Sequence, residues 1–247
     1  MQQLEYTRMA EFEKSFWWHK GKLFLVRNLI EMYNPGRNLP LEILEIGCGT
    51  GEITQSLMEY GNVKGVDISE EAINFCLERN IENVVLGDIN NLDISQDKEK
   101  YDFILALDVL EHIQDDLETM RRAHFMLKKG GHFIVNVPAH KFLWSEHDEA
   151  LHHRRRYHSV EIKQKLKDSG FEIVKYSYFV TTAFFPIFLI RTITTLFKRN
   201  AYPKTSYIAL PSFLNNFAIK VMDIEAKLLT KMKLPIGTTI TVVAKKI

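Results

Sequence analysis

A glycine-rich segment between a predicted strand and a predicted helix is the clearest chemical signal in the sequence. The residues EIGCGTG at 45–51 follow an apolar run that begins at residue 41. Glycine lets a backbone turn tightly and approach a ligand without a Cβ clash. In the dinucleotide pattern G-x-G-x-x-G, the third glycine lies three residues after the second. Here Gly51 follows Gly49 by two residues and an acid, Glu45, precedes the first glycine. The segment therefore predicts a ligand cradle that departs from the dinucleotide pattern.

Two acids follow at the ends of the next two predicted strands. Asp67 lies twenty residues after Gly47, where a carboxylate can accept both hydroxyls of an adenosine ribose. Asp88 can accept from the amino group of adenine, and Ile89 can pack on the ring. Doubly wound sheets bind ligands at the carboxyl ends of their strands, so we expect one adenosine site there. The alternative for each residue is that it only terminates a strand.

A segment rich in histidine and arginine, LWSEHDEALHHRRRY at 143–157, follows the fifth predicted strand. His147 oriented by Asp148 can act as a general base, because histidine titrates near neutral pH. The alternatives are a structural His-Asp pair, with Arg155 and Arg156 anchoring the next helix, or arginines that bind an acidic acceptor group. The spacing of the candidate ligands matches no familiar metal set, so no metal site is predicted. Those candidates are His147, Asp148, His152 and His153.

The elements that must position these residues follow a simple alternation. The segment 1–34 has helical spacing, and from residue 41 short β-branched runs alternate with amphipathic helices, which predicts a parallel sheet built of βαβ units. Ser69 and Ser159 are predicted N-caps. We expect a single domain with four parts. They are a helical cap at 1–40, a cofactor-binding core at 41–179, an apolar and amphipathic helical insertion at 180–236, and a final strand at 237–247.

Composition excludes several classes of protein. Lysine and arginine total 32 against 31 acids, so no basic excess favours nucleic acid as a partner. Two cysteines are too few for a disulfide framework. No secretory signal is recognised at the start, which predicts a cytoplasmic protein. The apolar part of 180–236 has four possible roles. It binds lipid at the inner face of the membrane, closes over a hydrophobic substrate, packs on the core, or forms a homodimer interface.

Residues 41–138 resemble the class I S-adenosylmethionine-dependent methyltransferases. EIGCGTG, GVDIS, GDI and DVLEHI match that family's successive motifs. The resemblance implies an α/β fold with a doubly wound seven-stranded sheet of order 3-2-1-4-5-7-6, the last strand antiparallel. It also implies S-adenosyl-L-methionine as the cofactor. The implied contacts are Glu45, Gly47, Cys48, Gly49, Gly51, Asp67, Ile68, Asp88, Ile89 and Asp108.

The segment at 145–157 resembles a narrower bacterial and archaeal subgroup that shows S-x-H-D-x-x-x-x-H-x-R-R-Y. The matching residues are His147, Asp148, His153, Arg155, Arg156 and Tyr157. We expect catalysis to involve His147, Asp148 and His112, where His112 either faces the methyl group or helps Glu111 to cap a helix. We expect the acceptor to contact His153, Arg155, Tyr157 and Trp18, with Trp18 either in a lid or in the core.

The sequence therefore predicts a methyltransferase that acts on a small-molecule or lipid-linked acceptor, at oxygen before nitrogen. A nicotinamide-dependent oxidoreductase is the rival enzyme class. It requires the third glycine one residue later than the sequence has it. A cofactor-binding regulatory or scaffold subunit without turnover is the alternative outside enzymes.

Overall fold

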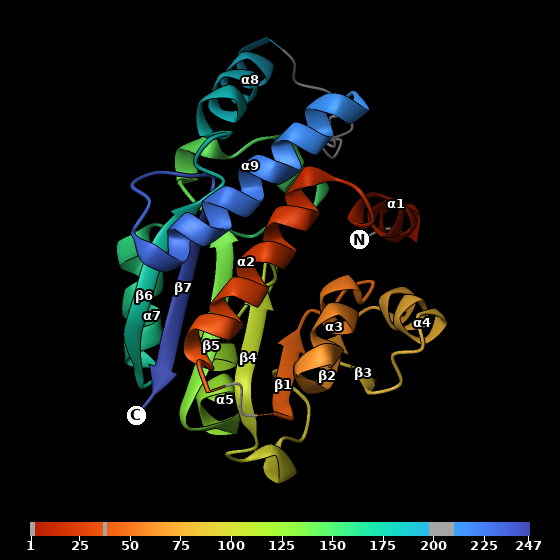
Figure 1. The fold of residues 1–247 in the computed structure, drawn as a ribbon, viewed down its shortest axis with the longest axis vertical. Coiled ribbons are helices and arrows are strands. Elements are labelled where there is room, and N and C mark those ends of the chain that lie inside the picture. Colours follow the sequence, from red (N-terminus) through yellow and green to blue (C-terminus); the bar gives the residue numbers. More distant parts are fainter. Residues whose placement is uncertain (1–2, 37–38, 198–209) are drawn as a thin grey trace.

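A seven-stranded sheet forms the centre of the computed structural model, which describes residues 3–36, 39–197 and 210–247 (Figure 1). The strand order is β3-β2-β1-β4-β5-β7-β6, and β7 runs antiparallel to both β5 and β6. This confirms the expected fold class. The strands are β1 Leu41–Ile46, β2 Gly61–Asp67, β3 Val84–Leu86, β4 Tyr101–Leu107, β5 Leu127–Pro138, β6 Phe171–Phe179 and β7 Thr239–Lys246.

Helices cover both faces of this sheet. The α-helices are α1 Gln3–Glu13, α2 Trp17–Tyr33, α3 Glu52–Leu57, α4 Glu70–Glu78, α5 Asp116–Met126, α6 Glu146–Ala150, α7 Ser159–Asp168, α8 Phe184–Phe197 and α9 Ser212–Lys231. Short 3-10 helices lie at Met58–Tyr60, Ser95–Asp97 and Lys141–Leu143. The predicted segment 1–34 is thus divided into two helices. Among the described residues, no helix combines the length and the apolar character that a membrane span requires.

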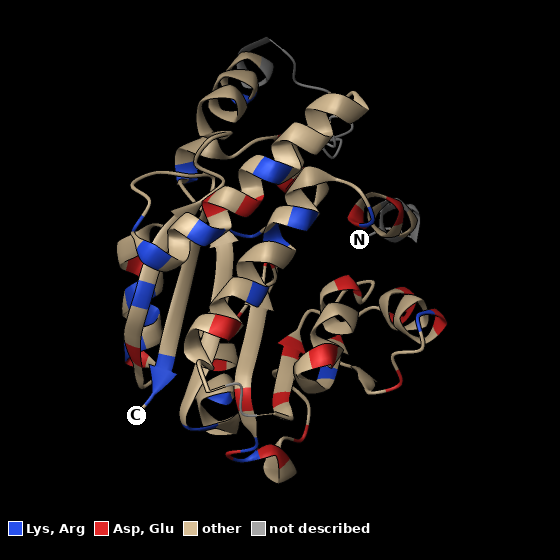
Figure 2. Ribbon diagram, viewed as in Figure 1, with Lys and Arg blue, Asp and Glu red and all other residues tan. Residues whose placement is uncertain are grey.

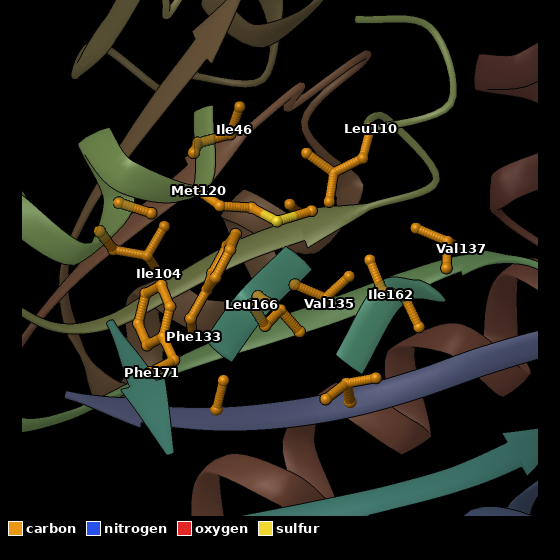
Figure 3. Packing of buried hydrophobic residues seen from close by; sticks show 14 of the residues in the cluster. Ile46, Ile104, Leu110, Met120, Phe133, Val135, Val137, Ile162, Leu166 and Phe171 are labelled. Carbon is orange, nitrogen blue, oxygen red and sulfur yellow. The ribbon is translucent and has the colours of Figure 1, made fainter. Parts of the chain in front are cut away.

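Two hydrophobic cores hold the layers together. On one face, α5 and α7 place Met120, Ile162 and Leu166 against the sheet residues Ile104 and Phe133 (Figure 3). On the other face, α2 and α9 lie side by side across the sheet, with α9 on the side of β6 and β7 (Figure 1). Their buried side chains are Leu25, Val26, Leu29, Ile30, Met222, Ala226 and Leu229. The strands read as near-continuous apolar runs because both of their faces are buried.

The start of α4 agrees with the sequence, whereas the start of α7 does not. The hydroxyl of Ser69 accepts from the backbone N–H of Ala72 at 3.3 Å, as an N-cap should. The prediction of Ser159 as an N-cap is wrong, because Ser159 is the first helical residue and His158 takes the N-cap position. The main chain at His158 is extended, which moves the boundary by one residue.

A buried glutamate joins the two helices of the late insertion. Glu225, on α9, is 4% exposed. Its Oε1 accepts from the backbone N–H of Thr181 at 2.7 Å, and its Oε2 accepts from the N–H and hydroxyl of Thr182 at 3.2 and 3.1 Å. These bonds satisfy polar groups just before α8 and fix α8 relative to α9. The part of the predicted insertion at 198–209 lies outside the described residues.

Replacing this glutamate should loosen the insertion. Glu225→Ala leaves two backbone donors without their acceptor, and we expect the free energy of unfolding to fall by about 2–4 kcal/mol. Urea denaturation measures it. The control is Asp223→Ala on the same helix, which removes a surface pair with Lys227 and should cost about 0.5 kcal/mol or less. Equal losses in the two variants would contradict this role for Glu225.

Candidate active site

The loop after β1 is compact because its glycines have no side chains. Gly47 has φ +74°, and a Cβ built on it would lie 2.5 Å from Cγ2 of Val109. Gly51 has φ +85°, and a Cβ there would lie 2.7 Å from Cδ1 of Ile81. Larger residues would strain the backbone and collide with these neighbours. The main chain of 47–51 is therefore pressed against the post-β4 turn on one side and the α4 region on the other.

Asp67 lies at the end of β2, the strand beside β1, and binds the glycine loop that follows β1. Its Oδ2 accepts from the N–H of Gly49 at 2.9 Å, and its Oδ1 accepts from the N–H of Ser69 at 3.0 Å. Burial raises the pKa of the Asp67 carboxyl, and the backbone N–H groups oppose that rise. Each carboxylate oxygen has two lone pairs, so both can accept a further hydroxyl. This geometry suits the ribose contact that the sequence predicts.

The N-terminal helices contact this same loop through charged side chains. Glu13 accepts from the hydroxyl of Thr50 and pairs with Arg79 at 3.1 Å. Lys20, on α2, pairs with Glu52 at 2.6 Å. The sequence analysis did not find these contacts, because nothing in the local pattern relates residue 13 to residue 50. The helical cap therefore closes over the glycine loop.

The residues expected around adenine occupy different environments. Ile68 is 73% exposed, whereas Ile89 is 4% exposed and packs in the core beneath the sheet edge. The expectation that Ile89 packs on a ring does not fit this burial, and Ile68 is the isoleucine with free surface. Asp88 is exposed, and its Oδ1 accepts from the N–H of Asn90. The side chain of Cys48 points into a small buried cluster with Cys76 and Ile81, so only its backbone can line the loop.

Asp108, directly after β4, is bound by residues from two other elements. It has φ +54°; its Oδ1 accepts from Nδ2 of Asn136 at 3.0 Å and its Oδ2 pairs with Nζ of Lys22 at 3.1 Å. Lys22 also lies 4.3 Å from the ring centroid of Trp18. Trp18 is therefore adjacent to the sheet edge, as expected of a residue near the site. The i, i+4 spacing of Trp18 and Lys22 was the available sign of this cation–π contact.

Glu111 and His112 lie in the turn between β4 and α5. The alternative that they cap a helix is wrong, because Asp115 caps α5 by accepting from the N–H of Glu118 at 3.0 Å. Burial lowers the pKa of His112 to about 4, so its imidazole is neutral at pH 7. Burial and the charge of Asp108 raise the pKa of Glu111 well above its usual value. His112 contacts His153, whose ring centroid lies 4.7 Å away.

Asp148 orients His153, whereas the sequence analysis paired Asp148 with His147. Its Oδ1 is 2.9 Å from Nδ1 of His153 and accepts from Nε of Arg156 at 2.7 Å. Burial raises its pKa, but the bond with His153 and the charge of Arg156 hold the pKa below its usual range. Burial also lowers the pKa of His147 to about 3, with a further contribution from Arg191. His147 is thus a weak base at neutral pH.

Two residues expected to bind the acceptor instead brace the loop. Tyr157 is fully buried; its hydroxyl donates to Oδ2 of Asp116 at 2.8 Å and lies 3.2 Å from the carbonyl of Leu110. Arg155 pairs with Asp116 at 3.0 Å and donates to the carbonyl of Gln114. Burial leaves the Tyr157 side chain no surface for a ligand, so its predicted contact with the acceptor does not fit the structure. His153 remains beside His112.

Two groups of side chains in the described part of the chain have the composition of a metal site. One is Glu111, His112 and His153, and the other is Glu13, His19 and Glu52. In the second group both carboxylates already pair with cations, Glu13 with Arg79 and Glu52 with Lys20. In the first group Glu111 forms no ion pair with a lysine or arginine of the described residues, and the charge of Asp108 acts on it.

The buried acid before the glycine loop should give the protein a distinctive pH dependence. Glu45 accepts from the hydroxyl of Thr54, and burial raises its pKa from 4.5 to about 8. Between these values the folded state keeps a proton that the unfolded state has lost, so stability falls as pH rises. Glu45→Gln removes this dependence. We expect the variant to gain on the order of 2 kcal/mol relative to the parent between pH 5 and pH 8.

Thermal melts of both proteins across that pH range measure the effect, with Glu42→Gln on the same strand as the control. The carboxylate of Glu42 bonds Asn62 at the surface. Buried histidines contribute equally to both proteins, so they cancel in the difference. If the difference in melting temperature between Glu45→Gln and its parent is the same at every pH, the prediction is refuted.

Comparisons with known proteins agree with this architecture. A family model described as "Methyltransferase domain" matches residues 17–176. The ubiquinone biosynthesis O-methyltransferase of Pseudomonas aeruginosa (strain UCBPP-PA14) is 28% identical over 101 residues, which cover 39% of this chain and 44% of that protein. The ubiquinone biosynthesis O-methyltransferase of Marinobacter nauticus is 30% identical over 101 residues, which cover 38% of this chain and 42% of that protein. Each match thus spans less than half the length of these two curated relatives.

Solved structures share the fold. A SAM-dependent methyltransferase from Archaeoglobus fulgidus has a TM-score of 0.57 at 20% identity and covers 97% of this chain and 99% of its own. The [4+2]-cyclase SpnF has a TM-score of 0.59 at 16% identity, covering 94% and 86%. A fold shared with a cyclase does not fix the reaction. The family model, by contrast, covers more than half of the chain, and the protein therefore belongs to the S-adenosylmethionine-dependent methyltransferase domain family.

Proposed function

We propose that this chain transfers a methyl group from S-adenosylmethionine to an oxygen atom of a small or lipid-linked acceptor, with nitrogen as the second choice. One observation carries the proposal. The glycine loop fixed by Asp67 and the turn that holds Asp108 and His112 lie at the same carboxyl edge of the sheet, in contact where Gly47 meets Val109. The curated relatives act in ubiquinone biosynthesis as O-methyltransferases, which favours oxygen.

The residues at this edge fit the cofactor. The glycine backbone leaves room for a close approach, and Asp67 keeps free lone pairs for ribose hydroxyls. Ile68 offers exposed apolar surface for a base, and Asp88 offers a carboxylate beside it. Glu45 lies behind the loop and steadies the start of α3 through Thr54. When bound, S-adenosylmethionine supplies an electrophilic methyl carbon on a sulfonium sulfur.

Methyl transfer then requires the protein to align the acceptor and to accommodate its proton. Alignment of two reactants is the larger contribution in an in-line displacement. A hydroxyl acceptor also loses a proton. We assign His153 and the neutral His112 to positioning the acceptor's hydroxyl. Asp148 acts through His153, because it bonds Nδ1 and leaves Nε2 directed at the turn that holds Glu111.

Asp67 tests the cofactor assignment. Asp67→Ala removes a charged acceptor of the ribose hydroxyls, and we expect the dissociation constant for S-adenosylmethionine to rise about 10- to 100-fold. Calorimetric titration with S-adenosylmethionine, S-adenosylhomocysteine and NAD measures it. The matched control is Asp93→Ala, since Asp93 also accepts from the N–H two residues ahead, that of Ser95, and lies on the surface. Unchanged affinity in Asp67→Ala, or tight binding of NAD, would remove the basis for the proposal.

An apolar surface next to the site supports a lipid-linked acceptor. The exposed large apolar side chains on α8 and the first turns of α9 include Phe185, Phe188, Leu189, Ile190, Ile193, Phe213, Leu214 and Phe217. Lysines follow along α9 at 220, 227 and 231 (Figure 2). Apolar side chains beside lysines suit an anionic bilayer surface. Arg191 joins α8 to the site by donating to the carbonyl of Leu143 at 2.7 Å and lying 3.5 Å from Asp148.

Vesicle binding tests this part of the proposal. We expect the protein to sediment with vesicles that contain phosphatidylglycerol, more than with neutral phosphatidylcholine vesicles. The double variant Phe213→Ser, Phe217→Ser should reduce the bound fraction about tenfold, because two exposed aromatic rings are removed. The control is Val160→Ser on α7, which is 73% exposed on the opposite face of the sheet. The opposite outcome has two parts: the parent protein does not bind vesicles, and light scattering shows a homodimer that the double variant dissociates. The apolar surface would then be a dimer interface and not a membrane-binding surface.

A further inference from the structure

A carboxylate and two imidazoles converge between the turn after β4 and the segment after α6. Glu111 and His112 come from the turn, and His153 comes from the segment at 152–157. One ligand atom from each residue lies within 4.8 Å of the other two. The rings of His112 and His153 meet edge to face, at an interplanar angle of 84°. Residues distant in sequence thus present three donor atoms to one point.

Glu111 has an unsatisfied oxygen at this point. Its side chain is 1% exposed, and its Oε2 is buried without a hydrogen-bond partner in the described ranges. Its Oε1 lies 3.9 Å from Nε2 of His153, which is too long for a hydrogen bond. A buried carboxyl oxygen without a hydrogen-bond partner costs about 1–3 kcal/mol. A cation bound between Glu111 and His153 would satisfy both groups.

His153 is already oriented for such a role. Its Nδ1 bonds Oδ1 of Asp148 at 2.9 Å, which turns Nε2 toward Glu111. Metal-bound histidines commonly have a carboxylate on the other ring nitrogen, which fixes the tautomer and orientation. Asp148 is itself held by Arg156 at 2.7 Å and by the N–H of Ser145 at 3.0 Å. The imidazole therefore keeps its direction without help from an ion.

Backbone contacts clamp the two loops that carry the three residues. The N–H of Arg154 donates to the carbonyl of Glu111 at 2.8 Å, and its Nε donates to the carbonyl of His112 at 3.0 Å. The N–H of His153 donates to the carbonyl of Asp148 at 2.8 Å. These bonds fix the two loops relative to each other, with the three donor atoms within 4.8 Å of one another.

We propose that Glu111, His112 and His153 bind a divalent first-row transition-metal ion such as Mn²⁺, Fe²⁺, Co²⁺ or Zn²⁺. Two imidazoles with one carboxylate favour these ions over Mg²⁺ and Ca²⁺, which prefer oxygen ligands. The sequence analysis predicted no metal because it considered a single segment, whereas these ligands are divided between residues 111–112 and residue 153.

The site would serve the transfer step, and this role rests on the proposed function. Three protein ligands leave coordination positions open for an acceptor hydroxyl, whose proton becomes more acidic on the metal. The hydroxyl proton passes to water, and the oxygen lone pair forms the bond to the methyl carbon. The electrons of the carbon–sulfur bond return to sulfur. An acceptor with two neighbouring oxygens fits such a site best, because both can occupy open positions.

Cobalt binding tests the inference without any acceptor. The full chain, untagged and treated with EDTA, is titrated with Co²⁺ while visible d–d absorption and heat are recorded. We expect about one ion per chain and displacement by Zn²⁺. Glu111→Gln and His153→Gln should each weaken binding by at least about tenfold. The control His152→Asn changes the exposed neighbouring histidine and should bind Co²⁺ like the parent.

Parallel experiments separate this inference from the proposed function. Circular dichroism melts establish that the variants are folded, and the nearly isosteric Glu111→Gln guards against loss of packing. Titration with S-adenosylmethionine is run on the same samples. If the cofactor binds but no Co²⁺ spectrum develops, or if His152→Asn weakens binding as much as His153→Gln, the metal site is refuted and the proposed function stands. If Co²⁺ binds with the expected variant pattern but the cofactor does not, the site stands and the proposed function fails.

Discussion

One buried carboxylate, Asp148, holds together the segment after β5 that carries His153. It is inaccessible to solvent and bonds His153, Arg156 and the N–H of Ser145. A buried charge is tolerated only when it is paired and hydrogen-bonded. If these partners moved away, Asp148 would be left as an unpaired buried charge. Arg156 also donates to the carbonyl of Ala139, directly after β5. Asp148 therefore fixes the imidazole of His153 relative to the start of α6 and the end of β5.

The glycine loop and the turn after β4 depend on a comparable arrangement. Asp67 joins the β1 loop to the β2 end, and Lys22 joins α2 to Asp108. The N-terminal helices thus contribute charge to the sheet edge as well as apolar packing to its face. A chain without this cap would expose the glycine loop and leave Asp108 with Asn136 as its remaining polar partner among the described residues.

The apolar surface on α8 and α9 is physically linked to this edge. Glu225 fixes the start of α8, and Arg191 connects α8 to Leu143 and Asp148. A ligand that binds across the surface would therefore act on the same segment that orients His153. This coupling places the apolar surface and the polar residues around Asp148 on one side of the fold.

The sequence by itself determined the sheet, its order through the family resemblance, the glycine loop and the acids at the strand ends. Those features follow from local periodicity and from motifs in which neighbouring residues act together. Only the tertiary structure decided that Asp148 bonds His153 rather than His147, that Tyr157 is buried, and that Glu111 faces His153. These pairings join segments about forty residues apart or depend on which way a short helix turns its side chains. No local pattern encodes them, because they arise when the strand ends meet at one edge and the burial of each group selects its partners.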